Sequence, residues 1–255
     1  MKIEIDKHNA VNCVNKKVLL SNVKFWSKKG FALLEKQHVN KKELVILAGG
    51  ASLEEYKPDG RATIACGTAI KRCAELGITP DFWLNLDPLK DMIEFAEIAP
   101  KETIKIIATT SDKSLFRHCD KNTTVLFYPT SFEYNCKHRK ILNGTTVGIT
   151  SIVIGLHMGF RRFDCYGLDS CVIDGEEHAS GYYKRCESKE INKEDTSKKE
   201  IISIECNGKE FDCTPQNVMQ AIDFKNICTI WGEKFLIHFH GKGLLAQMMK
   251  GDSNE

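Results

Sequence analysis

The chain has 255 residues, 42% hydrophobic and 27% charged, which is ordinary for a globular protein with a sizeable core. Its 36 basic and 34 acidic residues are interspersed and leave a net charge of +2, which argues against nucleic acid as the main partner. The N-terminus lacks the apolar region of a secretory signal, and no stretch approaches the ~18 uninterrupted apolar residues that a membrane span needs. We therefore expect a cytoplasmic protein without a membrane span.

The eleven cysteines raise the question of disulfides or a zinc site. Their number is odd, they are scattered from Cys13 to Cys228, and no C-x-x-C pair or histidine at zinc-site spacing accompanies them. Several lie inside apolar runs, where a free cysteine behaves as a small hydrophobe. The sequence therefore predicts reduced core cysteines and no bound metal.

Residues 1–40 read as a helical, partly amphipathic lead-in. From Leu44 onward the pattern changes to short runs that are hydrophobic throughout, with turn residues between them. Such runs are typical of strands buried on both faces of a sheet. They cover residues 44–48, 62–66, 82–86, 104–108, 125–128 and 163–166.

Helix-start signals fall between these strands. Ser52 opens a capping box with Glu55, and Asp87-Pro88 resembles an N-cap followed by proline at the first helical position. A second helix is expected over residues 67–76, and Thr146 could cap an almost wholly apolar helix that ends near Met158. Alternating strands and helices predict an α/β fold with a doubly wound, mostly parallel sheet.

The last third departs from this alternation. Residues 184–200 are mostly polar and are expected to form a mobile loop. Residues 201–206 and 209–213, joined by Asn207-Gly208, predict a C-terminal β-hairpin insertion. A helix from Thr214-Pro215 to about residue 226 and a strand over residues 235–239 complete the expected elements.

Ligands of open α/β sheets bind beyond the carboxyl ends of the strands, so the residues after each strand are the candidates for a site. Gly49 and Gly50 follow the first strand and suit either a phosphate at a helix N-terminus or a plain tight turn. Asp87 follows the third strand and could bond a ribose hydroxyl, hold a metal ion, or only cap a helix.

Two further segments carry candidate residues. Small and hydroxyl-bearing residues precede the apolar helix, a pattern that favours close approach to a nucleotide or phosphate: Asn143, Gly144, Thr145 and Thr146. Gly167, Asp169 and Ser170 follow another strand and lead to His178. Either His178 acts as a general base or phosphate ligand, or it lies in an exposed loop and has no functional role.

The remaining histidines are better explained by structure. His157 lies within the apolar helix, and His238 and His240 alternate along the last predicted strand. We expect structural roles for all three.

In their order along the chain, several short motifs resemble those of the motility accessory factor (Maf) group. They are LAGGASL at 47–53, LGITPD at 76–81, LDP at 86–88, GTTV at 144–147, MGF at 158–160, GLDS at 167–170 and CTPQ at 213–216. The superfamily also contains the MptE-like 6-hydroxymethylpterin diphosphokinases. Its opening motif usually reads Gly-x-Gly-Pro-Ser-Leu, whereas Ala48 and Ala51 stand here for the first glycine and the proline.

The resemblance implies a Rossmann-like core similar to that of bacterial sialyltransferases, forming one transferase domain over residues 41–250. It implies transfer of a sugar, such as a nonulosonic acid, from a CMP-type donor to an unknown acceptor, without a cofactor. His178 and Asp169 would then be catalytic. Nucleotide or phosphate would be bound by Gly49, Gly50, Ser52, Asp87, Asn143, Gly144, Thr145, Thr146, Gly167, Ser170 and Tyr182, the last in a closing lid with Tyr183.

Two alternatives stay open. One is ATP-dependent diphosphoryl transfer to a hydroxymethylpterin or similar alcohol, which would require Mg²⁺; the LDP segment offers one carboxylate, Asp87, for that ion. The other is a nucleotide-binding module without catalytic activity.

Overall fold

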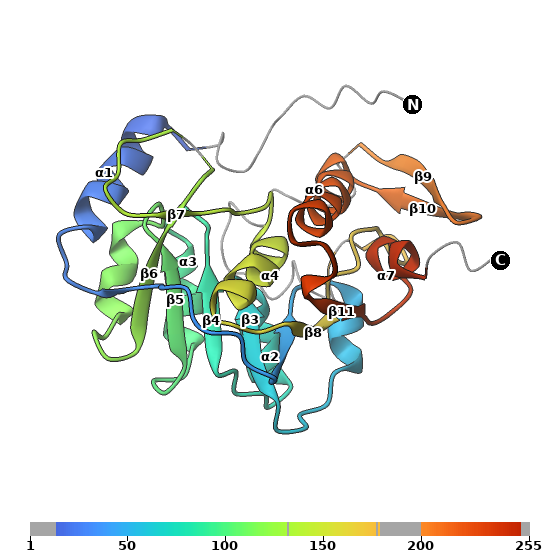
Figure 1. Cartoon of the computed structure of the whole chain (residues 1–255), viewed down its shortest axis with the longest axis horizontal. Coiled ribbons are helices and arrows are strands. Elements are labelled where there is room, and N and C mark those ends of the chain that lie inside the picture. The colour runs from blue at the N-terminus through green and yellow to red at the C-terminus, as the bar shows by residue number, and fades with distance from the viewer. Residues whose placement is uncertain (1–13, 132, 177, 179–199, 251–255) are drawn as a thin grey trace.

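A single large sheet forms the centre of the computed structural model, which describes residues 14–131, 133–176, 178 and 200–250 (Figure 1). The strand order is β1-β6-β5-β4-β3-β2-β8-β11, with β7 added beside β6, and all paired strands in this sheet run parallel. The strands are β1 (Ala32–Leu33), β2 (Glu43–Leu47), β3 (Ala62–Cys66), β4 (Phe82–Asn85), β5 (Ile104–Ala108), β6 (Thr124–Pro129), β7 (Lys140–Ile141), β8 (Arg162–Tyr166) and β11 (Leu236–Phe239). The predicted α/β fold with a mostly parallel sheet is confirmed.

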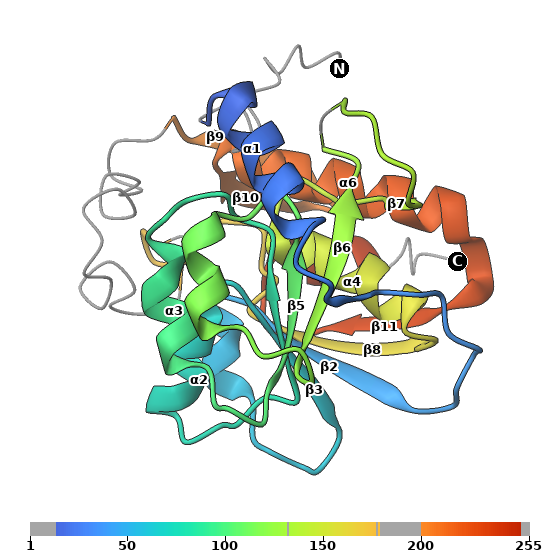
Figure 2. The same cartoon turned by 90° about the vertical axis from the view of Figure 1, so that its left-hand side faces the viewer.

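Helices cover both faces of this sheet, as Figure 2 shows. On one face lie α1 (Lys16–Trp26), α2 (Ala69–Glu75), α3 (Met92–Ile98) and the short 3₁₀ helices η2 (Ala51–Glu55) and η3 (Lys113–His118). On the other lie α4 (Val147–His157), α6 (Pro215–Trp231) and α7 (Leu244–Met249), with the 3₁₀ turn η6 (Gly232–Lys234) after α6. This arrangement is the doubly wound, Rossmann-like architecture.

Alternate residues of each central strand point into two separate cores. In β2, Leu44 and Ile46 join the core beneath α4 and α6, whereas Val45 and Leu47 join the core beneath α2 and α3. All four side chains are fully buried. This two-sided burial explains why the strands appear in the sequence as unbroken apolar runs.

Residues 14–40, the described part of the predicted helical lead-in, contribute to the same fold and are not helical throughout. Within this segment, α1 packs its fully buried Trp26 against the sheet, and the Trp26 indole donates a 2.9 Å hydrogen bond to the Ser111 carbonyl. After α1 the chain forms β1, which pairs with β6. Two-residue strands such as β1 and β7 carry too little pattern to be recognised in sequence.

The antiparallel hairpin of β9 (Ile202–Cys206) and β10 (Lys209–Cys213) confirms the predicted insertion. Both turn residues adopt positive φ angles, 48° at Asn207 and 72° at Gly208, as a tight Asn-Gly hairpin turn requires. The following helix, α6, begins at Pro215 as predicted but continues to Trp231 rather than ending near residue 226. Thr214 and Asn217 form a reciprocal capping box at its start.

Helix α4 begins where the sequence predicts and is buried along almost its whole length. The Thr146 hydroxyl accepts a 3.4 Å hydrogen bond from the Ile149 N–H and so caps the helix.

We predict that Thr146→Ala lowers the free energy of unfolding by about 1 kcal/mol, the usual contribution of an N-cap side chain. Urea denaturation would measure the change, and Thr146→Ser, which keeps the hydroxyl, should retain most of the stability. A stability of Thr146→Ala equal to that of the wild type would contradict the capping role.

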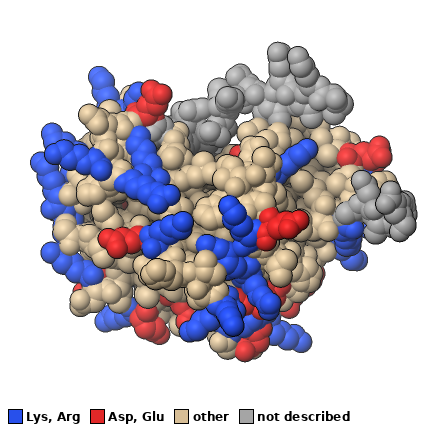
Figure 3. Space-filling model, in the orientation of Figure 1, with Lys and Arg blue, Asp and Glu red and all other residues tan. Residues whose placement is uncertain are grey.

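The cysteines of the described residues are all free, as the sequence predicts for that part of the chain. Burial raises the pKa of the Cys66 and Cys73 thiols to about 12, so both remain protonated at neutral pH. Figure 3 shows basic and acidic side chains interspersed along the lower part of one face. Within the described ranges, no helix is long and apolar enough to cross a membrane.

Candidate functional site

The order of the strands reverses between β2 and β8. From β2 the chain builds β3, β4, β5 and β6 outward in one direction, and it then returns through α4 to place β8 on the other side of β2. In an open parallel sheet, such a switch point leaves a crevice at the carboxyl ends of the strands. A cavity of about 210 Å³ lies at this point.

The cavity brings together most of the residues singled out in the sequence. Its lining includes Gly49, Gly50, Asp87, Thr145, Thr146, Gly167, Asp169, Ser170 and His178. These residues follow β2, β4, β7 and β8, so segments far apart in the sequence meet at one edge of the sheet. Their roles in ligand binding or catalysis remain predictions.

Ser52 does not begin a helix, so the predicted capping box is wrong. It lies within the five-residue 3₁₀ helix η2, whose N-cap position is Gly50. The buried Ser52 hydroxyl instead accepts a 2.7 Å hydrogen bond from the Gly167 N–H, while the Ser52 N–H donates to Asp169 Oδ2 at 3.0 Å. Ser52 therefore joins the loop after β2 to the loop after β8 and lies behind the cavity.

Gly50 and Gly167 allow these two loops to touch. The Gly50 N–H donates to the Gly167 carbonyl at 2.8 Å. A Cβ at position 50 would lie 2.7 Å from that carbonyl oxygen and closer still to Asp169 Oδ2. Gly167 has a φ of +74°, and a Cβ there would collide with the Ala48 carbonyl. Only glycine fits at either position without displacing backbone.

Asp169 is a buried carboxylate, with 3% of its surface exposed. Burial raises its pKa, and nearby Glu55 adds to the rise, while the hydrogen bonds from Ser52 oppose it. Its second oxygen, Oδ1, accepts no hydrogen bond from the described residues. The carboxylate thus fixes the two loops through one oxygen, and its other oxygen is buried without a hydrogen-bond donor among the described residues.

The raised pKa of Asp169 predicts a pH-dependent loss of stability. The folded protein binds the Asp169 proton more tightly than the unfolded chain, so this group favours folding at low pH. That contribution disappears as the pH rises from the unfolded pKa near 3.8 through the raised folded pKa. Relative to Asp169→Asn, which does not titrate, the wild type should therefore lose unfolding free energy over this window. Urea denaturation at several pH values would test this, and a constant difference would contradict it.

Thr145 and Thr146 line the cavity, but their hydroxyls have partners within the protein. The Thr145 N–H and hydroxyl both donate to Asp223 Oδ2 of α6, at 2.5 and 2.6 Å, and the Thr146 hydroxyl caps α4. Both hydroxyls are therefore already engaged within the protein. These bonds fix the α4 N-terminus against α6.

Asn143 and Gly144 lie beside the cavity and do not line it. The Asn143 side chain contacts the Thr130 hydroxyl at 3.2 Å, and the Gly144 N–H donates to Thr150 Oγ1 at 3.2 Å. These two residues shape the loop that leads into α4. Their predicted direct contact with a nucleotide stays a prediction.

Asp87 lines the cavity without capping a helix. Helix α3 begins at Met92 with Asp91 at the N-cap position, so the predicted start at Asp87-Pro88 is wrong. Asp87 Oδ1 instead accepts a 2.9 Å hydrogen bond from the Leu89 N–H, which forms a local turn. The turn holds the Asp87 carboxylate at the cavity wall.

His178 lies against the loop that follows β2. A Cβ at position 49 would stand 3.4 Å from His178 Nδ1, so the imidazole lies next to Gly49. The ring is partly exposed and lines the cavity, which gives a titratable group access to a bound ligand. Tyr182 and Tyr183, the predicted lid, and residues 184–199 of the predicted mobile loop lie outside the described residues.

Helix α6 supplies cavity residues that the sequence analysis missed, namely Gln216, Asn217 and Gln220. The Ser170 hydroxyl donates to Gln220 Oε1 at 2.6 Å, which links the loop after β8 to α6. The CTPQ motif marked the start of this helix, but nothing in the sequence showed that its first turns face the strand ends. The cavity therefore adjoins the N-terminal turns of both α4 and α6.

Two carboxylates, Asp87 and Asp169, line the cavity. Asp169 is buried and burial raises its pKa, whereas Asp87 is partly exposed, so Asp87 is the better placed to hold a Mg²⁺ ion. Mg²⁺ in nucleotide sites is commonly held by one or two carboxylates together with substrate phosphates, so this pair fits an ion that arrives with a nucleotide. Cys66 also lines the cavity, but its raised pKa keeps the thiol protonated.

Both the sequence and the fold of this chain are similar to those of known proteins. The family model described as 6-hydroxymethylpterin diphosphokinase MptE-like matches residues 17–175. A solved structure, a Maf glycosyltransferase from Magnetospirillum magneticum AMB-1, superposes with a TM-score of 0.65 at 14% identity, over 89% of this chain and 36% of that one. At this identity the likeness concerns the fold alone. No curated protein matches the sequence. Because the family model covers well over half of the chain, the protein belongs to the MptE-like family.

Proposed function

We propose that this protein is a nucleotide-dependent transferase and that it moves a sugar, such as a nonulosonic acid, from a CMP-type donor to an acceptor. The observation that carries the proposal is the cavity at the switch point between β2 and β8. Nucleotides bind at switch points of open α/β sheets, beyond the carboxyl ends of the strands. The superposed Maf glycosyltransferase supports the same class of reaction.

Backbone dipoles are the groups that could hold a phosphate in this cavity. No Lys or Arg occurs among the described residues that line it. The N-terminal turns of α4 and α6 adjoin it, and the positive end of a helix dipole attracts anions. We expect the donor phosphate to lie at the start of α4, next to the backbone of Gly49 and Gly50. Such preorganised dipoles stabilise the negative charge that develops on a departing phosphate.

We assign His178 the role of proton acceptor. In the transfer, the bond between the sugar and the donor phosphate breaks and a bond to the acceptor oxygen forms. The acceptor proton passes to the His178 imidazole, and the departing phosphate takes the negative charge. Asp87 would bond the ribose, and Asp169 would position the two glycine-containing loops through Ser52.

Diphosphoryl transfer from ATP to a hydroxymethylpterin is the second candidate, which the description of the matching family favours. In that reaction the alcohol oxygen attacks the β-phosphorus, and AMP leaves. Asp87 would then bind a Mg²⁺ ion carried by the phosphates, and the metal would neutralise their charge.

A thermal-shift screen with CMP, CDP, UDP, GDP, AMP and ATP, each with and without Mg²⁺, separates these proposals. A ligand at about 100 times its dissociation constant stabilises the folded state by about 2.7 kcal/mol. Stabilisation by CMP without metal is the result expected for glycosyl transfer. Stabilisation only by ATP with Mg²⁺ would favour diphosphoryl transfer, and no stabilisation by any nucleotide would contradict both. Binding without turnover of any donor would indicate a nucleotide-binding module.

A further inference from the structure

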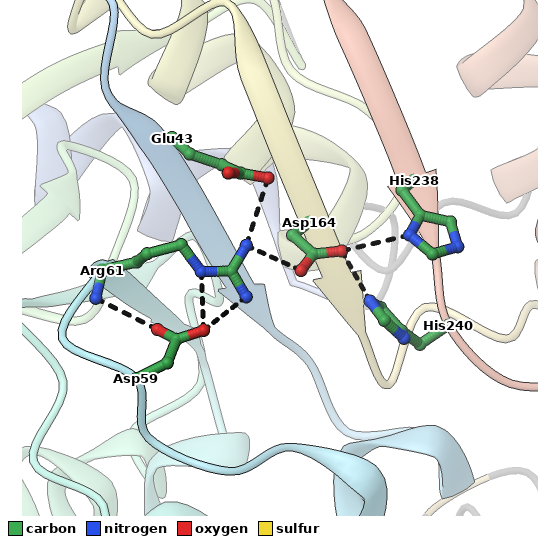
Figure 4. A network of polar contacts seen from close by, with 6 residues as sticks. All are labelled: Glu43, Asp59, Arg61, Asp164, His238 and His240. Carbon is green, nitrogen blue, oxygen red and sulfur yellow. Dashed lines mark hydrogen bonds and ion pairs between the residues drawn. The ribbon is translucent and has the colours of Figure 1, made fainter.

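Two histidines and a carboxylate converge on the face of the sheet near its β11 edge, outside the cavity. His238 pairs in register with Asp164 across the parallel strands β11 and β8, and His240 follows directly after β11. His240 Nε2 lies 2.6 Å and His238 Nδ1 3.4 Å from the same oxygen, Asp164 Oδ1 (Figure 4). The three potential ligand atoms all lie within 4.8 Å of one another.

The charges around Asp164 leave room for a dication. Its second oxygen, Oδ2, contacts the Arg61 guanidinium at 2.8 Å, and Arg61 also pairs with Asp59 at 2.6 Å and Glu43 at 3.1 Å (Figure 4). Three carboxylates thus surround one guanidinium, and these four groups together carry a charge of −2. A bound divalent cation would bring the network to neutrality.

We propose that Asp164, His238 and His240 bind a divalent transition-metal ion of the Zn²⁺ class. Imidazole and carboxylate are ligands that Zn²⁺ prefers, with metal–ligand distances near 2.0–2.2 Å. Ligand atoms of a tetrahedral site with such bonds lie about 3.4 Å apart. The separation between His238 Nδ1 and Asp164 Oδ1 already has this value, and the closer His240 Nε2 has to move outward by less than about 1 Å.

Neighbouring side chains hold two of the proposed ligands in place, and the third ligand is open to solvent. The His240 ring stacks on Tyr166 with ring centroids 3.8 Å apart, and Arg61 fixes the orientation of the Asp164 carboxylate. The Asp164 side chain is 10% exposed, whereas that of His238 is 70% exposed. A fourth ligand, such as water, can therefore reach the ion from the side of His238. None of the three residues lines the cavity at the switch point, so this inference does not depend on the proposed transferase activity.

Titration of the full chain with Co²⁺ tests the site, because Co²⁺ takes the place of Zn²⁺ and reports its ligands by its absorption spectrum. We expect one high-affinity Co²⁺ per chain, visible ligand-field bands, and no thiolate-to-metal charge-transfer band. Zn²⁺ should displace the Co²⁺. His238→Gln should weaken the affinity by more than the ~10–100-fold typical of losing a residue that only supports a ligand. Because His238 is exposed, we expect this variant to fold normally.

His38→Gln is the matched control, because His38 is also exposed and lies outside the cluster. It should bind Co²⁺ as the wild type does. Asp164→Asn and His240→Gln should each weaken binding as His238→Gln does, with circular dichroism confirming that each variant is folded. The proposal is overturned if the wild type binds no Co²⁺, if all bound Co²⁺ shows thiolate charge transfer, or if folded His238→Gln binds as tightly as the wild type.

Discussion

Gly50→Ala is expected to lower the free energy of unfolding by about 1–3 kcal/mol, the usual cost of an overpacked site, and to abolish nucleotide binding. The added methyl group would meet the Gly167 carbonyl oxygen at 2.7 Å and the Asp169 carboxylate more closely still. The backbone at Gly50 has a φ of −78°, which alanine adopts freely, so the substitution causes no backbone strain. Any loss of stability therefore comes from the collision of the methyl group with the loop after β8. Urea denaturation and a nucleotide titration would measure the two losses.

Gly49→Ala provides the matched control at the adjacent residue. Among the described residues, a Cβ there would meet only His178 Nδ1, at 3.4 Å, which is an ordinary van der Waals contact. This variant should therefore unfold at nearly the same urea concentration as the wild type. Equal stability and equal nucleotide affinity of Gly50→Ala and the wild type would show that the contact between the loops does not form the site.

His178→Ala is expected to reduce turnover by about 10²-fold or more, the usual scale for loss of a general acid–base group. The ring lies at the cavity wall beside Gly49, where it can accept the proton of an attacking hydroxyl. Nucleotide affinity should change much less than turnover, since the phosphate is expected to bind to backbone groups. Steady-state kinetics with the donor and acceptor identified by screening would measure the effect.

His38→Ala serves as the control for this variant as well, because His38 is exposed and lies beside Gly159, at the opposite end of α4 from the cavity. It should retain full turnover. Near-normal turnover of His178→Ala would remove His178 from the mechanism and leave positioning and electrostatic stabilisation as the sources of catalysis.

The central strands and the buried helix could be predicted because burial leaves a direct mark on the sequence. The two-sided core makes β2 apolar without alternation, and Thr146 marks the start of α4 with a hydroxyl cap. The short strands β1 and β7 have no such sequence pattern. Pairing with β6 positions them, and that pairing depends on tertiary structure rather than local composition.

The site could be predicted only as a set of segments after strands. The rule that ligands bind beyond strand ends correctly grouped Gly49, Asp87, Thr145 and Asp169 at one cavity. The local roles of Ser52 and Asp87 were wrong because each side chain found a partner other than a helix terminus, namely the Gly167 N–H and the Leu89 N–H. The contribution of α6 depends on its packing against α4, which no local pattern encodes.

A crystal structure of the chain with CMP would show whether the cavity at the switch point is the donor site. We expect the nucleotide to lie in the cavity between β2 and β8. Its phosphate oxygens should lie about 2.7–3.2 Å from backbone N–H groups at the start of α4 and in the Gly49-Gly50 loop. A cavity that stays empty at saturating CMP, or a nucleotide bound elsewhere on the protein, would contradict the assignment of this cavity as the donor site.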